Sequence, residues 1–513
     1  MRKLKKLSFV TLLVLVLANW SAPQIRQTKS QGHSLMRFDL LSNDSVEHIY
    51  DWHPIQSQVG VSDRSSFIPQ ANYTSHPPIL ISSNDDFVTL GFPGTGSASN
   101  PYHIDKLNIS GAFNFPAIKI ANTTAHFCIS NCFIRILNNR SWEDCTESGT
   151  VNEGVCNLDG IRLINVANGI IENCTLDFTR LTLGWRDSGA NGILLAACQD
   201  CLIDYNYITN FDSPIRVNGG GRNVTIENNF CTRGIHLDIT SYVEVINNSC
   251  RFIDLRGAST CVIKKNCCVN TQELDENEGF IYSGIEISKG WDYFFERLAP
   301  GDHNVIEQNF CSGFSAGIGL SGEHCSNNIL TNNTCSNNIY GIRISGDCHY
   351  NIVRKNWLEE NSGYGVYLAP GSKWIFGGWM SEPVYPSYNQ IFCNVFLNRN
   401  PDTTPQASDP GGLNGVEYNY WSDWSDHPDS DNDGFIDDSY PLDGGLLFLK
   451  ISDTHPLVNT SLAYSLTIDS VAIPQTYFFL RSLQKNFLLI LVVSLSFLAA
   501  AIVIFRKIRT RWD

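Results

Sequence analysis

Residues 226–231, Ile-Glu-Asn-Asn-Phe-Cys, return as Val-Ile-Asn-Asn-Ser-Cys at residues 245–250 and as Ile-Lys-Lys-Asn-Cys-Cys at residues 263–268. Each copy reads apolar-x-x-Asn-x-apolar, and the spacings between the aligned Asn residues are 19 and 18. A fixed period of about 20 residues is the signature of a repeat architecture.

The same pattern extends on both sides of this stretch. It places an aligned Asn at positions Asn206, Asn229, Asn248, Asn266, Asn309, Asn333, Asn356 and Asn394. The units lack the helical period of an α-solenoid, the Leu-x-x-Leu-x-Leu of a leucine-rich repeat and the period of about 40 residues of a propeller. We therefore predict an all-β fold, a right-handed parallel β-helix over residues 81–410, with successive strands about 4.8 Å apart.

Equivalent residues stack directly in such a coil. The recurring Asn is expected to form a hydrogen-bonded ladder at a turn, because its side chain satisfies backbone groups and tolerates left-handed backbone. The recurring Cys, Ile and Val are expected to fill the bore. The 17 cysteines therefore indicate mainly stacked core residues, with disulfides as the alternative in an oxidising compartment.

A second repeat, Gly-Ile-x-Leu, predicts a column of outward-facing residues. Its apolar residues face the bore, so the residue between them faces out. The members along the chain are Arg162, Leu194, Arg216, His236, Asp254, Glu286, Gly319, Arg343 and Tyr367. The candidate ligand-binding residues among them are Arg216, His236, Asp254, Glu286 and Arg343, and no catalytic residue is assigned.

Several interpretations of this column stay open. Asp254 and Glu286 would lie about 5 Å apart on adjacent turns, a separation that can raise one pKa and divide acid and base roles, as in retaining glycosidases. The Arg residues could hold acidic sugars. The simplest alternative is a solvated face on which opposite charges pair across rungs.

Two insertions near the column are rich in aromatic residues. Such residues suit sugar stacking or partner binding, and equally a small core within the loop itself. The first insertion contains Trp291, Tyr293, Phe294 and Phe295, and the second contains Trp374, Phe376, Trp379 and Tyr385.

The run Asp429-x-Asp431-x-Asp433-Gly434-Phe435-x-Asp437 has the spacing of a calcium-binding loop. Oxygen ligands recur at alternate positions, Gly occupies the sixth, and the carbonyl of Phe435 fits the seventh. Position twelve is Tyr440 instead of Glu. We expect Ca²⁺ bound by Asp429, Asp431, Asp433, Phe435 and Asp437 in an exit segment over residues 411–457, the alternative being a solvated acidic turn.

These repeats resemble those of exported parallel β-helix proteins of the NosD type. That family includes a periplasmic copper-site maturation protein and many archaeal surface proteins, within a wider group of carbohydrate-binding proteins and sugar hydrolases. Asn84-Asp85-Asp86-Phe87 and residues 94–102 resemble the entry cap of such chains, and Asn419-Tyr420-Trp421-Ser422-Asp423 resembles the exit segment. The resemblance covers residues 80–457 and implies the fold, but it implies no catalytic motif for this chain.

Copper is not supported by the sequence. Copper favours imidazole and soft sulfur ligands, whereas the 12 His are scattered and only three Met are present. Gly94-x-Gly96 lacks the third Gly of a dinucleotide loop and is followed by an extended segment, so no nucleotide cofactor is expected.

The two ends of the chain predict an exported, membrane-anchored protein. Residues 1–22 combine a basic start with an apolar run and indicate a signal peptide or signal anchor. Residues 487–505 are uncharged and long enough for one membrane crossing, and the basic tail 506–513 is expected in the cytoplasm. Residues 23–80 predict a loose leader and residues 458–486 a spacer. Asn-x-Ser/Thr sites from Asn43 to Asn459 suit a glycoprotein.

Charge argues against nucleic acid as a partner. The chain has 36 Lys+Arg against 51 Asp+Glu, and many of the basic residues lie at the two ends, so the acidic body repels phosphate backbones. We expect a cell-surface binding or adhesion module for glycans. The alternatives are a polysaccharide lyase, epimerase or glycoside hydrolase, and a NosD-like metalloenzyme maturation accessory. The lack of a Ser-His-Asp elbow, a zinc signature or an Asp-Pro-His-Asp motif favours binding over catalysis; the oligomeric state is not assigned.

Overall fold

The computed structural model describes residues 73–138, 158–180, 189–270, 283–292, 297–375, 380–398, 405–444 and 451–468. The chain divides into two units, Met1–Pro69 and Gln70–Asp513, and the first lies outside the described residues. The predicted signal segment 1–22 and membrane helix 487–505 also lie outside them, as do the Asn-x-Ser/Thr sites at Asn43, Asn72 and Asn139. Within the described part of the chain, no helix is long and apolar enough to cross a membrane.

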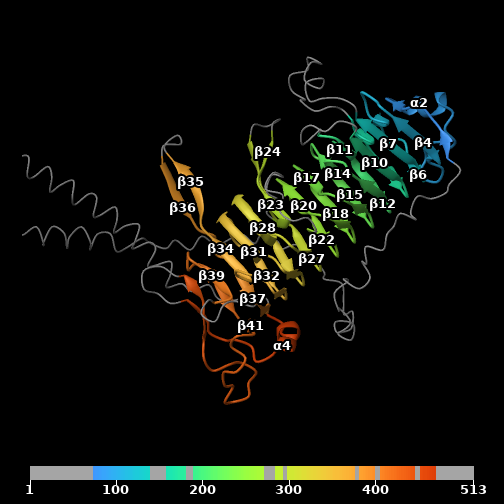
Figure 1. Ribbon diagram of the computed structural model, residues 1–513. Helices are drawn as coiled ribbons and strands as arrows, with labels where there is room; N and C mark the ends of the chain where they lie inside the picture. The colour runs from blue at the N-terminus through green and yellow to red at the C-terminus, as the bar shows by residue number, and fades with distance from the viewer. Residues whose placement is uncertain are drawn as a thin grey trace, which may run out of the picture. The chain divides into compact units, whose positions relative to one another are not determined.

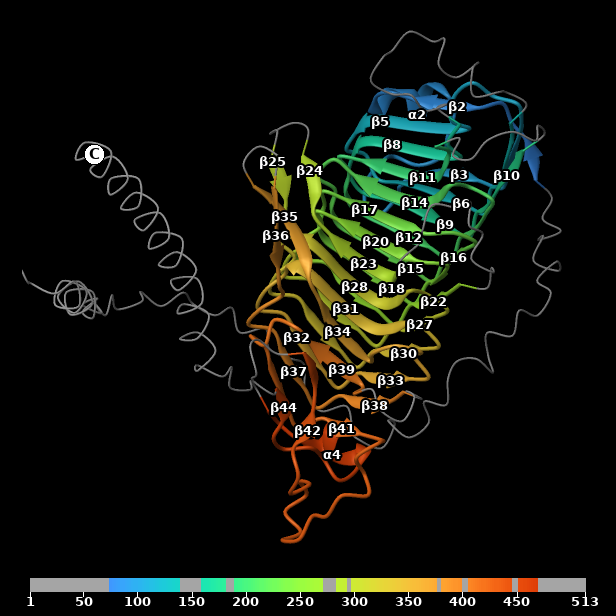
Figure 2. The ribbon, with the colours of Figure 1, turned by 60° about the vertical axis from the view of Figure 1, so that its left-hand side comes forward.

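Three parallel sheets form the body of the second unit. The chain visits sheet 1, sheet 2 and sheet 3 in turn, so that consecutive strands lie on different sheets and each strand pairs with its equivalent one turn later. Figure 1 shows this stack of strands, and Figure 2 shows it turned by 60°. The predicted parallel β-helix is confirmed, and its arrangement is consistent with the right-handed crossover that parallel strands favour.

The strands of each sheet are as follows. Sheet 1 has 13 strands: β1 (Thr74–Ser75), β4 (Leu107–Gly111), β7 (Phe133–Asn138), β10 (Thr175–Arg180), β13 (Tyr207–Thr209), β16 (Phe230–Cys231), β19 (Ser249–Cys250), β22 (Cys267–Val269), β27 (Phe310–Ser312), β30 (Thr334–Ser336), β33 (Trp357–Glu359), β38 (Val395–Leu397) and β41 (Tyr420–Trp421). Sheet 2 has 13 strands: β2 (Ile79–Ile81), β5 (Ile118–Thr123), β8 (Ile161–Val166), β11 (Asn191–Ala196), β14 (Ser213–Asn218), β17 (Ile235–Asp238), β20 (Ile253–Arg256), β23 (Ser283–Ser288), β28 (Ala316–Glu323), β31 (Tyr340–Asp347), β34 (Val366–Ala369), β39 (Ala407–Asp409) and β43 (Asp443–Gly444). Sheet 3 has 12 strands: β3 (Tyr102–Asp105), β6 (Phe127–Ser130), β9 (Gly169–Glu172), β12 (Gln199–Asp204), β15 (Arg222–Glu227), β18 (Ser241–Ile246), β21 (Val262–Lys264), β26 (Val305–Glu307), β29 (Ile329–Thr331), β32 (Ile352–Arg354), β37 (Gln390–Phe392) and β40 (Gly415–Glu417).

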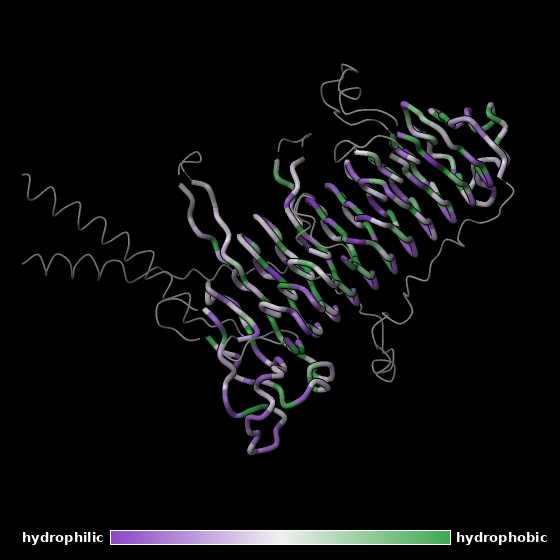
Figure 3. The backbone as a smooth tube through the Cα atoms, in the orientation of Figure 1, coloured by the Kyte–Doolittle hydropathy of each residue, from purple (hydrophilic) through white to green (hydrophobic). Residues whose placement is uncertain are grey.

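The interior of the coil is filled by stacked apolar side chains, as predicted. Cys250, Cys268, Cys311 and Cys335 occupy successive rungs of sheet 1 and are buried. Every Cys in the described part of the chain is a free thiol, so these residues act there as small core side chains. Apolar and polar residues alternate along the coil, as Figure 3 shows, because successive strand residues point to opposite faces.

The Asn ladder is confirmed as a continuous chain of hydrogen bonds between sheets 3 and 1. At each step the backbone N–H and Nδ2 of one Asn donate to Oδ1 of the next, as between Asn229 and Asn248 at 2.9 and 3.0 Å. Two further ladders occupy the other two turns. One starts at Asn304 and continues through Asn328, Asn351, Asn389 and Asn414, and the other joins Asn338, Asn361 and Asn398.

The two ends of the coil differ from the predicted boundaries. The first turn begins at β1 and β2, within the segment assigned to the leader, because Thr74 pairs with Leu107 and Ile79 with Ile118. Helix α2 (Asn84–Thr89) closes this end, with the buried ring of Phe87 stacked on Tyr102 at 4.6 Å. At the other end, β40, β41 and β43 continue the three sheets into the segment assigned to the exit.

Three short antiparallel pairs and one helix complete the described structure. The hairpins β24 (Gly290–Asp292) with β25 (Arg297–Ala299) and β35 (Gly371–Ile375) with β36 (Met380–Val384) follow the ends of sheet 2 strands. They project from the same side of the coil in Figures 1 and 2. The pair β42 (Tyr440–Pro441) with β44 (Ser452–Asp453) and helix α4 (Thr460–Ser465) lie in the exit region.

Candidate functional site

The predicted outward column exists on the outer face of sheet 2. Strand register aligns all nine of its members, from Arg162 through Asp254 and Glu286 to Tyr367, each directly paired with the next. The geometry that the repeat predicted is therefore present, while ligand binding by these residues stays a prediction.

The N-terminal half of the column is a network of opposite charges. Arg216 pairs with Asp238 of the following rung at 2.7 Å. Asp254 is bonded by Arg256 at 2.6 Å and lies 3.5 Å from Nδ1 of His236. The alternative of charges paired across rungs thus describes this part well, and Asp238 and Arg256 are partners that the repeat pattern did not single out.

Glu286, one rung after Asp254, has different partners. Its two carboxylate oxygens accept hydrogen bonds from the hydroxyls of Ser283 and Ser321, each at 2.5 Å. The next position of the column is Gly319, and a Cβ there would meet Glu286 Oε2 at 2.2 Å. Gly319 therefore leaves the space that the Glu286 carboxylate occupies.

The environments of the two carboxylates move their pKa values in opposite directions. Burial acts to raise the pKa of Asp254, but the His236 hydrogen bond and the charge of Arg256 outweigh it and leave that pKa below its ordinary value. Burial dominates at Glu286 and, with the charge of Asp254, holds its pKa above the ordinary value despite the two Ser hydrogen bonds. A pair separated in this way can divide proton donor and anion roles.

In the C-terminal half of the column, a cation lies next to a cluster of aromatic rings. Arg343 is paired in register with Tyr367, and the ring of Tyr367 lies 4.9 Å from Tyr340 and 5.3 Å from Tyr364. The three rings are half-buried. The Tyr364 hydroxyl donates to Asp443, and burial together with this contact raises the pKa of Tyr364 to about 12. We call Tyr340, Tyr364 and Tyr367 the tyrosine cluster.

Arg343 also lines a cleft of about 350 Å³ at the ends of the sheet 2 strands, beside the β35–β36 hairpin. Lys289, Glu323, Ser345, Asp347 and Ser372 share its wall. A larger cleft of about 530 Å³ lies near the entry cap, where Asp105 is already bonded by Ser130 and Asn131. The column does not reach that cleft, so the smaller one is more relevant to the predicted site.

A series of hydrogen-bonded side chains near the smaller cleft was not predicted from the sequence motifs. Asp347 lies 2.6 Å from Nε2 of His349, and Nδ1 of His349 lies 2.9 Å from the hydroxyl of Ser387. Ser387 is only 4% exposed, and the neighbouring backbone N–H groups of Tyr350 and Tyr388 already donate to carbonyls. This series of hydrogen bonds therefore links adjacent rungs. Its side chains and these two N–H groups offer no free donor for a developing oxyanion.

The aromatic insertions are only partly described. Trp291 in β24 is 46% exposed, and Tyr385 follows β36. Tyr293, Phe294, Phe295, Phe376 and Trp379 lie outside the described residues, as does the side chain of Trp374. The proposal that these loops stack on sugars thus stays a prediction.

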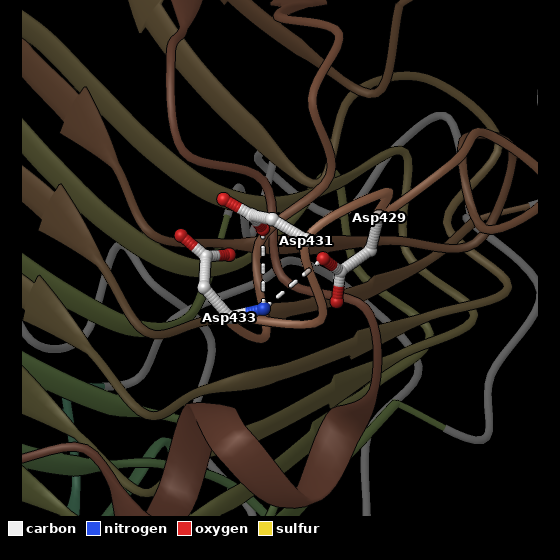
Figure 4. Close-up of side chains that lie close together, drawn as sticks. All are labelled: Asp429, Asp431 and Asp433. Carbon is white, nitrogen blue, oxygen red and sulfur yellow. Dashed lines mark hydrogen bonds between the residues drawn. The ribbon is translucent and has the colours of Figure 1, made fainter.

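The Asp-rich run folds into a closed loop in the exit segment. The carboxylates of Asp429, Asp431 and Asp433 bring one oxygen each within 4.8 Å of one another, and Figure 4 shows them around the backbone nitrogen of Asp433. That nitrogen donates to Asp429 and Asp431 at 3.2 Å. Asp437 instead accepts from the backbone of Ser430, so the structure groups three of the predicted calcium ligands.

In comparison with known proteins, a family model described as periplasmic copper-binding protein (NosD) matches residues 296–425. The NosD-type resemblance is thereby confirmed, and the matched stretch is a minority of the chain. No curated protein matches. Solved structures with a similar fold include a mannuronan C-5 epimerase A-module, AlgE6, from Azotobacter vinelandii (TM-score 0.41, 11% identity, 62% of this chain and 82% of that one). They also include DFA-IIIase from Arthrobacter chlorophenolicus A6 (0.38, 12%, 62% and 84%) and the periplasmic alginate epimerase AlgG (0.38, 14%, 66% and 82%).

The described residues do not fit a copper site. Among them, the only group of three His, Cys, Asp or Glu side chains with converging ligand atoms is the all-carboxylate set Asp429, Asp431 and Asp433. Copper favours imidazole and sulfur ligands, and the stacked thiol of Cys311 is buried, with a pKa that burial raises.

Proposed function

We propose that this protein is an exported surface β-helix that binds glycans across the outer face of sheet 2. The observation that carries the proposal is the tyrosine cluster, whose Tyr367 continues the charged column on sheet 2. Aromatic rings supply apolar faces, and neighbouring charged groups supply directional hydrogen bonds. Sugars present both kinds of surface, with C–H faces and hydroxyl edges.

The rigidity of the face supports this role. Every column residue lies on a strand paired on both sides, and ladders from Asn304 and from Asn338 onward bond the later turns that flank sheet 2. A site built on strands loses little conformational entropy when a ligand binds. A polymer lying along the coil axis would contact successive rungs, about 4.8 Å apart, without rearrangement of the protein.

Export and anchoring are part of the same proposal. They rest on the apolar segments 1–22 and 487–505 and on the basic tail. A NosD-type body suits a position outside the membrane. An anchored rod with its binding face along its side could present that face to extracellular polysaccharide.

Catalysis is the second candidate function, and the Asp254–Glu286 pair favours it. Glu286 would act as the proton donor, and Asp254 would stay ionised to stabilise positive charge or to accept a proton. The two sit on adjacent rungs, which is near the separation of about 5 Å in retaining glycosidases. The role of a copper-enzyme maturation accessory has no donor set in the described residues to support it.

We also propose that Ca²⁺ closes the loop at Asp429, Asp431 and Asp433. Carboxylates at alternate positions match the preference of Ca²⁺ for oxygen ligands. The loop adjoins the core of the coil, since Phe435 bridges to Leu457 and Ile436 is buried. The ion would therefore act as a structural clamp on the exit segment.

A polysaccharide array probed with the full-length protein tests the binding proposal. Wild type should bind one or more glycans, and Tyr340→Ala with Tyr367→Ala should reduce that binding at least about tenfold through loss of aromatic contact. Tyr242→Ala is the matched control, because Tyr242 is exposed at the start of β18 in sheet 3. The proposal would be contradicted if wild type bound no glycan, or if Tyr242→Ala lost as much binding as the double variant.

A further inference from the structure

Arg343 is a cation that the described structure leaves without a partner. Its Nε atom is buried and makes no hydrogen bond, and the described residues give its guanidinium no ion pair. A buried polar nitrogen without a partner is costly, and a charged one more so. A group of this kind in a native protein calls for a water, an ion or a ligand atom.

The nearest acidic side chains have other partners. Glu286 lies two rungs away, where the charge of Arg343 still acts on it, but its oxygens accept from Ser283 and Ser321. In the cleft, Glu323 pairs with Lys289 at 3.5 Å and Asp347 with His349 at 2.6 Å. Arg343 is therefore the group of the cleft that can accept a new negative charge without breaking an existing pair.

Two features of the surroundings limit the chemical class of ligand that Arg343 could bind. Arg343, which lines the cleft, is paired in register with Tyr367 of the tyrosine cluster. The chain as a whole is acidic, with a formal charge of -15, and such a body repels a dense polyanion at long range. A sugar unit that carries a single carboxylate supplies an anion for Arg343 and a ring for the tyrosine cluster.

We propose that Arg343 anchors the carboxylate of a uronic acid unit in the cleft, with the sugar ring against the tyrosine cluster. The planar guanidinium fork matches a planar carboxylate through two parallel hydrogen bonds. This inference rests on the proposed glycan binding and adds the chemical class of the ligand. It assigns Arg343 a specificity role and needs no covalent step.

The test is calorimetric titration of the full-length protein with uronate oligosaccharides. Oligomers of galacturonate, glucuronate and mannuronate are each compared with their carboxyl-methylated forms, which keep the sugar and remove the charge. At least one acid form should bind about tenfold or more tightly than its methyl ester, since only the acid form offers the guanidinium a charge-assisted hydrogen bond. Arg343→Met should abolish that preference and Arg343→Lys should restore part of it.

Arg354→Met provides the matched control. Arg354 has the same unpartnered Nε but lies in β32 of sheet 3, away from both described clefts. It should leave the preference unchanged. If acid and ester forms bind wild type equally, or if Arg354→Met and Arg343→Met act alike, the inference fails while glycan binding stands. If sulfated sugars show the larger Arg343-dependent preference, the carboxylate assignment is overturned. If neither acidic nor neutral glycans bind, the proposed function fails as well.

Discussion

Asn419 donates its backbone N–H and its Nδ2 to Oδ2 of Asp453, at 2.9 and 3.3 Å. The long Asn ladder therefore ends on a carboxylate. Every amide of the ladder points its donors toward this end, so their dipoles add in the manner of a helix dipole and favour a negative terminus. The other two ladders end in the same way, on Asp409 after Asn414 and on Asp423 after Gln406.

Removal of the ladder terminus should destabilise the coil. In Asp453→Ala the donors of Tyr418, Asn419, Trp421 and His455 lose their acceptor. A buried donor left unsatisfied costs about 1–3 kcal/mol, so the loss should exceed about 3 kcal/mol. Chemical denaturation of Asp453→Ala and of the exposed Asp426→Ala measures it. An equal effect in the two variants would contradict the role of Asp453.

Stability should fall as the pH rises from about 4 toward neutrality. Burial raises the pKa of Asp453 to about 7 and that of Asp409 to about 6, against the ordinary value of 3.8. Groups with raised pKa values contribute stability that is complete below the unfolded pKa and lost as the pH rises through the folded pKa. The melting temperature should therefore decline between about pH 4 and pH 7 from these groups. Asp453→Asn should flatten the decline, and an unchanged profile in that variant would show that Asp453 is not its source.

Replacement of an Asn inside the ladder should destabilise the protein far more than replacement of an exposed Asn outside it. Asn266→Ala removes the acceptor of Asn248 and the side chain's own bonds to Val245 and Asn309. We expect a loss of about 2–4 kcal/mol from several unsatisfied buried groups. Asn114→Ala, at an exposed position between β4 and β5, should cost less than about 1 kcal/mol. Urea denaturation measures the free energy of unfolding of the two variants. Similar midpoints would mean that the ladder Asn contributes no more stability than the exposed one.

A side chain at position 319 should be less costly when Glu286 is shortened. Gly319→Ala should destabilise by about 1–3 kcal/mol through overpacking, because its Cβ would meet both the Glu286 carboxylate and Ser283 Oγ. In the Glu286→Ala background the same change should cost less, because only the contact with Ser283 Oγ remains. A double-mutant cycle measured by thermal melting gives the coupling, and additive effects would show that the carboxylate is not held above Gly319.

Calcium should stabilise the exit segment. A ligand that binds only the folded state at 100 times its dissociation constant adds about 2.7 kcal/mol, so millimolar Ca²⁺ should raise the melting temperature. Asp431→Asn should weaken the rise, whereas Asp426→Asn should not. No shift with Ca²⁺ would leave the loop as a solvated acidic turn.

The repeat made the register of the coil predictable. Because Asn229, Asn248 and Asn266 recur at nearly one turn, the residues in the middle of each Gly-Ile-x-Leu can be aligned from their spacing alone. The stacking of Asp254 on Glu286 and of Arg343 on Tyr367 follows directly from that register.

Contacts made by residues that do not recur in the repeat could not be predicted from the spacing. Asp453 reaches Asn419 through the antiparallel pair β42–β44, where no repeat continues. Arg256 and Asp238 lie on neighbouring positions whose pairing depends on side-chain geometry. Tyr340 and Tyr364 precede the repeated motif, so only the fold shows that they flank Tyr367. Strands β1 and β2 were assigned to the leader because they are too short for an alternating pattern.

Hydroxyl-radical footprinting with a glycan selected on the array tests the binding face most directly. Tyr340, Tyr364 and Tyr367 should be oxidised less when the glycan is present, while Tyr205, Tyr242 and Tyr350 should react as before. Protection of the second group, or equal reactivity of the first with and without glycan, would contradict recognition on the outer face of sheet 2.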